Sequence, residues 1–598
     1  MTTEENETAQ DLEELNENLA KVEALSQRLV AALAQKPAQR AGLQGPGQDL
    51  YMKAYSAYLG ELMSNPARLV EHQVSFWGKT LRHYLEAQSA LARGKLQAPE
   101  DLTPMDRRFS DPLWKTHPFF NFLKQQYMLN AEAMHNMVDA LEGLDEREKR
   151  RVKFFTTQIV DLFSPANFLG TNPEALSKAV ETQGQSLVQG LENLVHDLEE
   201  SDAGLNVTLA DKDAFEIGGN IATTPGKVVF RNRLFELIQY SPATETVRET
   251  PLVVFPPWIN KYYILDLKPK NSLIRWVVEQ GYTLFVVSWV NPRDGFADVG
   301  LDTYVEEGYL TAIDQVKKIT GQAQINAVGY CIAGTTLSLT LAYLHKKGDK
   351  SIRSATFFTA LTDFADQGEF TPFLTDDFVD ALEAEMAEKG YLSSSIMART
   401  FSFLRSNDLV YQPAIRSYMM GEMPPAFDLL YWNGDGANLP GRMCTEYLRW
   451  LCQKNLFAKG EMPLLGEVLT LKDVRVPLIS IGCETDHIAA WRSCYSGVQQ
   501  MGSRSKAFIV SQSGHIAGVV NPPNKNKYGH YTNDDLSLDP QRWFDSATFS
   551  EGSWWPRWEA WLSKRSGKKT RARVPKNALC DAPGTYVTVP ANPGDEPH

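Results

Sequence analysis

One cysteine in a glycine-flanked turn is the most chemically suggestive feature of this sequence. Cys331 follows a strand-like run over 324–328 and precedes a helix-like run over 332–344, with Gly329 and Gly334 close on either side. A sharp strand-to-helix turn needs small neighbours because its central residue adopts a strained backbone conformation. The turn also points amide N–H groups at the sulfur, which favours a thiolate. These residues predict a nucleophile elbow with cysteine in place of the usual serine.

The motif departs at one position from the usual G-x-S-x-G pattern, since Ala333 stands in the fifth place and Gly334 follows it. The competing interpretation is a structural cysteine, because free cysteine is among the most buried residue types. What decides between the two is whether the other residues of a catalytic site follow at the expected places.

An acid and a histidine do follow in the order that a hydrolase-type site requires. Each should lie on a loop at the carboxyl end of a strand. Asp486 comes after a predicted strand over 476–481, and His515 comes directly after a predicted strand over 506–510. We therefore predict that Cys331 is the nucleophile, Asp486 the acid and His515 the base.

Other residues compete for two of these roles. Asp363 and Glu484 are weaker candidates for the acid. His530 is a weaker candidate for the base, because it lies further past the last predicted parallel strand in a loop rich in Asn, Lys and Tyr.

The surrounding sequence predicts an α/β protein. Continuous apolar strands over 250–255 and 283–289 alternate with helices, which is typical of a parallel sheet covered on both faces. With the elbow, this predicts an α/β-hydrolase fold over 201–598. An aromatic, helix-rich insertion over about 364–472 has the place of a lid above the active site, and residues 1–200 predict an all-α N-terminal domain.

Size, charge and cysteine content narrow the class of protein. A chain of 598 residues predicts two domains, and a net charge of -13 argues against a nucleic-acid partner. The six cysteines form no C-x-x-C pair, so we expect no metal site and a reducing, cytoplasmic location. The acidic N-terminus predicts no signal peptide, and no apolar run is long enough for a transmembrane span.

The chain resembles the class I polyhydroxyalkanoate synthases from about residue 106 to about residue 587. The resemblance rests on long motifs: Pro256-Pro-Trp-Ile-Asn-Lys-Tyr-Tyr-Ile-Leu-Asp266, Gly329-Tyr-Cys-Ile-Ala-Gly-Thr335, Phe427-Asp-Leu-Leu-Tyr-Trp-Asn433, Asp486-His487, Ser513-Gly-His-Ile-Ala-Gly-Val-Val-Asn-Pro-Pro523 and Glu551-Gly-Ser-Trp-Trp-Pro556. Members of that family usually carry Gly-Gly where this chain has Ala333-Gly334.

The resemblance implies polymerisation of (R)-3-hydroxyacyl-CoA thioesters into a polyester, with release of CoA and an acyl-cysteine intermediate on Cys331. His515 would move the thiol proton, and Asp486 would either orient His515 or act as base on the 3-hydroxyl group. The backbone N–H groups of Ile332 and Trp258 would form the oxyanion hole. No cofactor is expected, because CoA is part of the substrate.

The remaining expectations concern assembly. The helical region 1–200 and the aromatic helix over 553–561 suggest a homodimer and contact with the polyester granule or its coat proteins, with a flexible tail from about 581. The competing functions are a thioesterase or depolymerase that transfers the acyl group to water, and an inert granule-binding scaffold.

Overall fold

The computed structural model describes residues 17–18, 21, 24–29, 105–140, 144, 146–200, 206–293 and 295–591. The chain forms two compact units. The helical unit comprises Met1–Asp211 and Arg399–Pro425, and the sheet unit comprises Lys212–Ala398 and Ala426–His598. The segment Arg399–Pro425 comes from the middle of the predicted insertion. Residues 30–104 of the predicted all-α region lie outside the described residues.

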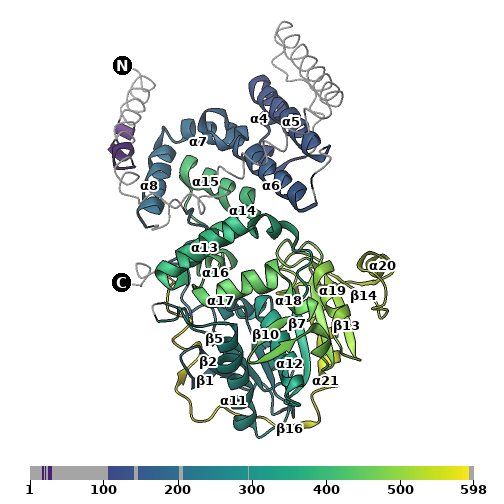
Figure 1. The fold of residues 1–598 in the computed structure, drawn as a ribbon. Coiled ribbons are helices and arrows are strands. Elements are labelled where there is room, and N and C mark those ends of the chain that lie inside the picture. The colour runs from purple at the N-terminus through teal and green to yellow at the C-terminus, as the bar shows by residue number, and fades with distance from the viewer. Residues whose placement is uncertain are drawn as a thin grey trace, which may run out of the picture. The chain divides into compact units, whose positions relative to one another are not determined.

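A single 11-stranded sheet forms the centre of the sheet unit (Figure 1). Its spatial order is β15 (Thr548–Ser550), β14 (His530–Thr532), β13 (Lys506–Ser511), β12 (Leu478–Cys483), β7 (Ile352–Phe358), β6 (Ile325–Tyr330), β4 (Leu252–Phe255), β5 (Leu284–Trp289), β2 (Phe235–Tyr240), β1 (Gly226–Arg231) and β17 (Cys580–Asp581). The strands from β13 to β5 in this order are parallel, and the outer ones pair antiparallel. Each predicted parallel strand is therefore present.

The register brings the functional loops to one edge of this sheet. Gly329 at the end of β6 pairs with Phe357 of β7, and Cys483 at the end of β12 pairs with Ser511 of β13. Because parallel strands end at the same edge, the segments that follow β6, β12 and β13 start beside one another.

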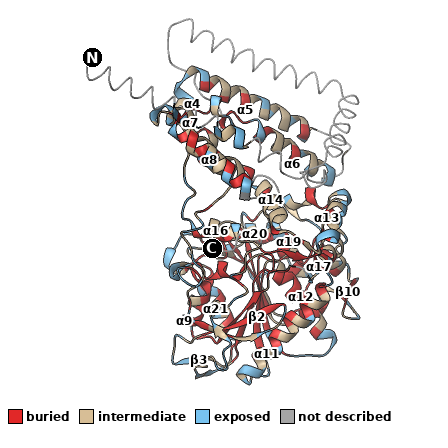
Figure 2. Cartoon of the chain, turned by 90° about the vertical axis from the view of Figure 1, so that its left-hand side faces the viewer, coloured by how far each residue is buried: buried red, intermediate tan, exposed pale blue. Residues whose placement is uncertain are grey.

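Helices cover both faces of the sheet. Figure 2 shows α9 (Leu273–Glu279) and α21 (Trp555–Ser563) on one face and α11 (Thr311–Thr320) and α12 (Ile332–Lys346) on the other. The strands between them are rich in β-branched and aromatic residues and are buried on both faces, as in β4 and β5. The rest of this unit contains α10 (Leu301–Thr303), α13 (Asp376–Lys389), α16 (Asp428–Gly434), α17 (Gly441–Glu446), α18 (Leu456–Lys459), α19 (Trp491–Gln500), α20 (Pro540–Asp545) and two π-helical stretches, η7 (Tyr304–Leu310) and η11 (Tyr447–Gln453).

The aromatic C-terminal helix α21 belongs to the core. Trp554, Trp555 and Trp558 are all buried and pack against α9 and the sheet. The aromatic content of this helix, which suggested an external contact, therefore has an internal explanation.

Residues 580–591, where a flexible tail was predicted from about 581, instead pack on the sheet unit. Cys580–Asp581 forms β17, and the Val587 side chain is buried. The Tyr586 hydroxyl donates a hydrogen bond of 2.7 Å to the Asn232 carbonyl, and the Tyr586 amide donates to the carboxylate of Glu236. Buried apolar and hydrogen-bonded groups outweigh the Pro and Gly content that suggested a loose tail.

Short two-stranded sheets complete the unit: β3 (Thr246–Arg248) with β16 (Lys569–Arg571), β8 (Tyr391–Leu392) with β9 (Leu439–Pro440), and β10 (Met462–Leu464) with β11 (Glu467–Leu469). The β8–β9 pair joins two parts of the predicted insertion.

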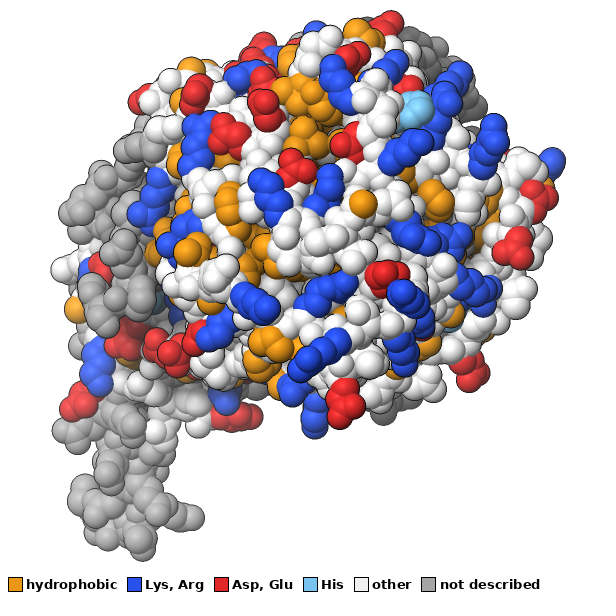
Figure 3. All heavy atoms as spheres, turned by 90° about the horizontal axis from the view of Figure 1, so that it is seen from below, with side chains coloured by type: hydrophobic (Ala, Val, Ile, Leu, Met, Phe, Trp, Pro, Cys, Tyr) orange, Lys and Arg blue, Asp and Glu red, His pale blue; other side chains and the backbone are white. Residues whose placement is uncertain are grey.

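Charge is unevenly distributed over the sheet unit. Figure 3 views the molecule from below, where the parallel strands begin, and Lys and Arg side chains gather on this face. Exposed basic residues close to the strand starts include Lys350, Arg353, Lys472, Arg504, Lys568 and Lys569. Although the whole chain has a net charge of -13, the edge of the sheet where the parallel strands begin is rich in basic side chains. Cys331 lies at the other end of the strands.

The described part of the helical unit consists of α4 (Leu113–Thr116), α5 (Pro118–Asp139), α6 (Glu146–Leu162), α7 (Pro173–Glu181), α8 (Gln185–Glu200) and the short α15 (Gln412–Ala414), and the boundary between the units falls within α14 (Ser394–Leu404). Phe109, Trp114, Phe120 and Tyr127 are buried in its core. These helices agree with the predicted all-α region.

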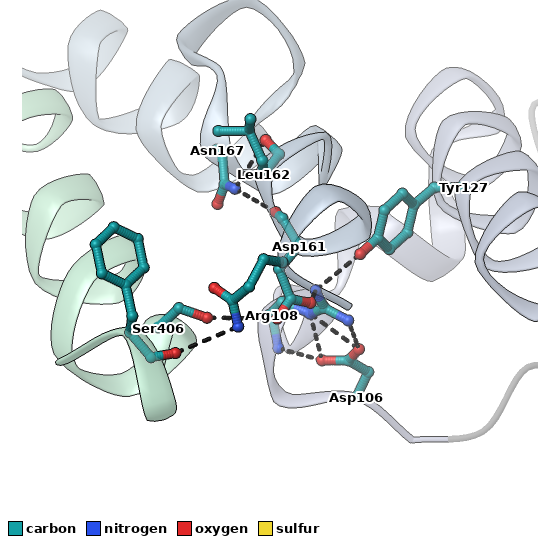
Figure 4. Close-up of polar contacts among 9 residues, drawn as sticks. Asp106, Arg108, Tyr127, Asp161, Leu162, Asn167 and Ser406 are labelled. Atoms are coloured by element: carbon teal, nitrogen blue, oxygen red, sulfur yellow. Dashed lines mark hydrogen bonds and ion pairs between the residues drawn. The ribbon is translucent and has the colours of Figure 1, made fainter. Parts of the chain in front are cut away.

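A partly buried polar network ties the start of this unit together (Figure 4). The Arg108 guanidinium contacts the carboxylates of Asp106 and Asp161 at 2.7 and 2.8 Å and the Tyr127 hydroxyl at 2.8 Å. The Ser406 hydroxyl also donates to Asp161, at 3.5 Å. A residue of the insertion thereby joins the N-terminal network.

The insertion segment 399–425 is also packed along α8. The Tyr418 hydroxyl donates a hydrogen bond of 2.6 Å to Asp197, and Ala175 is buried with Ile415 and Met420. A Cβ on Gly190 would lie 2.1 Å from the Tyr418 carbonyl oxygen, so only glycine permits this close approach.

Among the described residues, no helix is both long and apolar enough to cross a membrane.

Candidate active site

Cys331 occupies a strained turn between β6 and α12. Its backbone has φ 54° and ψ -129°, a left-handed conformation that non-glycine residues rarely adopt. The Cys331 amide donates to the Phe358 carbonyl at 2.8 Å, and the Cys331 carbonyl accepts from the Gly334 amide at 2.8 Å. These bonds hold the residue at the N-terminus of α12, as an elbow requires.

The two flanking glycines are needed because the strand and the helix pass very close to each other. A Cβ on Gly329 would lie 2.6 Å from the Gly334 Cα, and a Cβ on Gly334 would lie 2.5 Å from the Ala360 Cβ. Ala333, which departs from the usual motif, is fully buried, and its carbonyl accepts a hydrogen bond of 2.8 Å from the Tyr309 hydroxyl. Gly334 is thus the sterically required glycine of the elbow.

Asp486 and His515 are hydrogen-bonded to each other. The distance from His515 Nδ1 to Asp486 Oδ2 is 2.7 Å, and the Asp486 side chain is fully buried. The other carboxylate oxygen of Asp486 accepts from the amides of Ile488 and Ala489, each at 2.8 Å. Both oxygens are therefore engaged, and the carboxylate is fixed in one orientation towards the imidazole.

The environment of His515 favours the protonated imidazole. Burial by itself lowers the pKa of His515, but the charge of Asp486, the nearby Cys331 sulfur and the hydrogen bond to Asp486 hold this pKa well above its usual range. The imidazole also stacks on Tyr330, with ring centroids 5.8 Å apart and 27° between the planes. An imidazolium beside the sulfur is the arrangement that stabilises a thiolate.

Two backbone donors are available for an oxyanion. The amides of Ile332 and Trp258 have no hydrogen-bond partner among the described residues. Ile332 begins α12, so its N–H also carries the positive end of the helix dipole. The Trp258 side chain is buried, with its indole N–H 3.3 Å from the Thr336 hydroxyl of the same helix.

The loop that carries Trp258 is held by the insertion. Lys261 Nζ lies 2.5 Å from an Asp435 carboxylate oxygen, and the Tyr263 hydroxyl donates to the other oxygen at 2.7 Å. The Trp432 indole N–H donates to the Lys261 carbonyl at 2.7 Å. Motifs that are far apart in the sequence thus meet in one small cluster.

The weaker sequence candidates have other partners. Asp363 accepts from the side-chain amides of Asn455 at 2.8 Å and Gln500 at 2.5 Å. His530, predicted in a loop, lies on β14 with its Nδ1 3.0 Å from the Gly552 carbonyl, and burial lowers its pKa. The structure thus pairs Asp486, and neither Asp363 nor Glu484, with His515.

Sequence reasoning did not single out Tyr447 of η11. Its ring meets Trp258 and Phe364 edge-on, each at 5.8 Å. Burial raises the pKa of Tyr447 strongly, and the nearby Cys452 and Cys331 sulfurs raise it further. No spacing pattern in the aromatic insertion could have distinguished this tyrosine from its neighbours.

Among the described residues, no cluster of three His, Cys, Asp or Glu side chains could hold a metal ion.

The sheet order and the elbow define an α/β-hydrolase fold, and the family described as alpha/beta hydrolase fold matches residues 252–522. This confirms the predicted fold class. A solved thioesterase domain from the curacin biosynthetic pathway aligns with 49% of this chain and 94% of its own, at 11% identity and a TM-score of 0.29, which is too loose a likeness to carry an argument.

The relatives are more specific. The family described as Poly-beta-hydroxybutyrate polymerase (PhaC) N-terminus matches residues 105–277. A poly(3-hydroxyalkanoate) polymerase subunit of Cupriavidus necator is 41% identical over 88% of this chain and 89% of its own length. A poly(3-hydroxyalkanoate) polymerase of Methylorubrum extorquens is 39% identical over 94% and 96%. The chain belongs to the poly(3-hydroxyalkanoate) polymerase family, as its motifs predicted.

Proposed function

We propose that this polymerase joins (R)-3-hydroxyacyl-CoA thioesters, such as 3-hydroxybutyryl-CoA, and releases CoA through an acyl intermediate on Cys331. The observation that carries the proposal is the hydrogen bond of 2.7 Å between Asp486 and His515, together with a nucleophile elbow and two amides that have no partner in the part of the chain that the structure describes. The family membership supplies the product class, and the site supplies a chemistry that fits it.

In the first step, the Cys331 sulfur, whose proton is held by His515, attacks the thioester carbonyl of the substrate. The amides of Ile332 and Trp258 stabilise the oxyanion that develops on that carbonyl. When the C–S bond to CoA breaks, the leaving thiolate takes the proton back from His515. One thioester is exchanged for another, so the acyl group keeps its activation.

In the elongation step, the 3-hydroxyl oxygen of one unit attacks the acyl carbon of another thioester. An ester bond forms, the C–S bond breaks, and the departing sulfur receives the hydroxyl proton. The buried Trp258 and the Tyr447 ring packed edge-on against it exclude water, which would otherwise hydrolyse the acyl-enzyme. Polymer and CoA are then the only products.

The roles left open for Asp486 can be separated by rapid mixing. With Asp486→Asn and 3-hydroxybutyryl-CoA, an orienting role predicts that the first CoA release per enzyme slows together with elongation. A role as base on the 3-hydroxyl predicts a normal first release and a slow elongation. Because both carboxylate oxygens are already hydrogen-bonded, we expect the first outcome. Asp363→Asn, at the competing acid, is the matched control and should change neither phase.

The overall proposal is tested by incubating the protein with 3-hydroxybutyryl-CoA and analysing the products. Insoluble polyester and free CoA support it, whereas free 3-hydroxybutyrate would mean transfer to water. Mass spectrometry of the quenched enzyme should find the acyl group on the peptide that contains Cys331. Full activity of Cys331→Ala would disprove the nucleophile.

Three further parts of the proposal concern the setting of the reaction. We expect a homodimer in the cytoplasm that acts at the granule surface, with granule coat proteins as additional partners. Exposed apolar side chains on the helical unit, among them Phe119, Phe163 and Val180, support such a contact. Sedimentation with purified granules and analytical ultracentrifugation test these points. Activity after treatment with a chelator tests the expected independence from metal cofactors.

A further inference from the structure

The loop that carries His515 is held by the C-terminal segment of the chain. The Trp554 indole N–H donates a hydrogen bond of 2.8 Å to the Gly518 carbonyl. The Trp555 indole N–H donates one of 2.9 Å to the Val519 carbonyl. Both indoles are fully buried, so water cannot replace either donor. Two adjacent tryptophans thus fix two adjacent carbonyls, three and four residues after the imidazole.

A continuous chain of aromatic rings makes a second connection from Trp554 to His515. Trp554 meets Phe358 edge-on at 5.1 Å, and Phe358 meets Tyr330 at 6.3 Å. Tyr330 stacks on the His515 ring, and its hydroxyl donates a hydrogen bond of 3.2 Å to the His515 carbonyl. The backbone and the ring of His515 are therefore both supported from the direction of Trp554.

The loop has little room to move between these supports. A Cβ on Gly518 would lie 2.5 Å from the Cys483 sulfur, so the loop backbone sits directly on the end of β12. The Ser511 hydroxyl donates a second hydrogen bond, of 2.9 Å, to the Gly518 carbonyl. Asp486, the partner of His515, follows β12 by three residues, so the same contact sets the spacing between the two loops.

We propose that Trp554, assisted by Trp555, is a positioning residue that holds His515 between Asp486 and Cys331. The inference rests on the proposed role of His515 as the base. Proton transfer from the sulfur needs the imidazole within hydrogen-bond reach, and displacements well below 1 Å are costly. A tryptophan almost forty residues further along the chain would then control the geometry of the reaction without touching the substrate.

The test compares Trp554→Phe with Trp558→Phe. Trp558 is an equally buried indole of the same segment, but its N–H donates to the Thr356 hydroxyl of β7, at 3.0 Å, instead of to the His515 loop. Both variants remove one indole hydrogen bond and a similar volume. We expect Trp554→Phe to lower kcat by about ten- to a hundredfold with KM changed by less than about threefold, and Trp558→Phe to leave both near wild type.

The pH dependence of Cys331 alkylation by iodoacetamide gives a readout that a purely structural role would not move. The titratable groups facing the imidazole are Asp486, Cys331 and Tyr330. A loosened His515 stabilises the thiolate less, so the midpoint of the alkylation profile should rise in Trp554→Phe and stay unchanged in Trp558→Phe. Trp555→Phe should have a smaller effect, because the ring contacts through Phe358 and Tyr330 connect His515 to Trp554.

Ser511→Ala keeps the test decisive if Trp554→Phe does not fold, since it removes the other donor to the Gly518 carbonyl and leaves the indole in place. It should raise the alkylation midpoint in the same direction. The inference would be overturned if the alkylation profile of Trp554→Phe equalled that of Trp558→Phe. It would also be overturned if the profile of Ser511→Ala equalled that of Trp558→Phe. Wild-type activity of His515→Gln would instead disprove the proposed base.

Discussion

Substitution of Gly334 by alanine is a direct test of the elbow geometry. Replacing a helical glycine by alanine ordinarily stabilises a protein by up to about 1 kcal/mol, because glycine loses more backbone freedom on folding. Gly334 lies in the first turn of α12, so helix propensity taken by itself would predict a gain in stability. The structure predicts the opposite sign, since the new Cβ would lie 2.5 Å from the Ala360 Cβ and 2.9 Å from the Gly329 oxygen.

Neither neighbour can yield easily. Gly329 is strand backbone, and Ala360 follows β7, so relief requires a shift of α12 against the sheet. Overpacking of this kind typically costs about 1–3 kcal/mol. The shift would also displace Cys331, which precedes α12 directly, so we expect a loss of polymerisation larger than the loss of stability suggests.

Gly434→Ala is the matched control, because Gly434 is also helical, in α16, and a Cβ added there would have no neighbour within 4 Å. Urea unfolding followed by tryptophan fluorescence gives the free energy of unfolding of both variants, and CoA release gives their activity. We expect Gly334→Ala to be less stable than wild type and Gly434→Ala to be equal or more stable. An equal gain in both variants would refute the close approach of strand and helix at the elbow.

Three further predictions follow from the site and its surroundings. Cys331→Ser should form polymer at least about a hundredfold more slowly than wild type in a CoA-release assay, since a serine hydroxyl is far less readily ionised than a thiol. Lys261→Met removes the cation that contacts the half-buried carboxylate of Asp435, so urea unfolding should record a loss of about 1–3 kcal/mol, with CoA release reduced through the loop that carries Trp258. Burial raises the pKa of Asp266 to about 6, so the folded protein binds a proton at Asp266 more tightly than the unfolded chain does. The stability that this protonation contributes is present below about pH 4 and is lost as the pH rises through 6, a change of about 3 kcal/mol in the free energy of unfolding. Urea unfolding measured across this pH range should show the change in wild type and not in Asp266→Asn.

The sequence was most informative where local chemistry and packing agree. The strands around Val254 and Ile481 are mostly apolar and are buried at every position, as expected for a sheet covered on both faces. Their order in the sequence led to the loops of Asp486 and His515. Cys331 was found because a strained turn requires small residues next to the nucleophile position. This requirement can be read directly from the sequence.

Contacts between distant segments could not be found in this way. Nothing in the local sequence distinguishes the indole of Trp554, which reaches the His515 loop, from that of Trp558, which reaches a strand. The Pro and Gly content after residue 581 resembled a loose tail, because the Glu236 carboxylate that holds Tyr586 comes from a strand about 350 residues earlier. Burial of this kind depends on the fold and not on local composition.

The segment 399–425 leaves the sheet unit, packs along α8 and returns. The helical unit of this enzyme therefore includes a segment whose neighbours in the sequence, on both sides, belong to the sheet unit. A fragment that begins at residue 212 would contain Ile415 and Met420 but not the surface that buries them. We expect this fragment to aggregate. Supplying residues 105–211 as a separate polypeptide should restore its solubility, so the two fragments would be expected to reassemble when they are co-expressed.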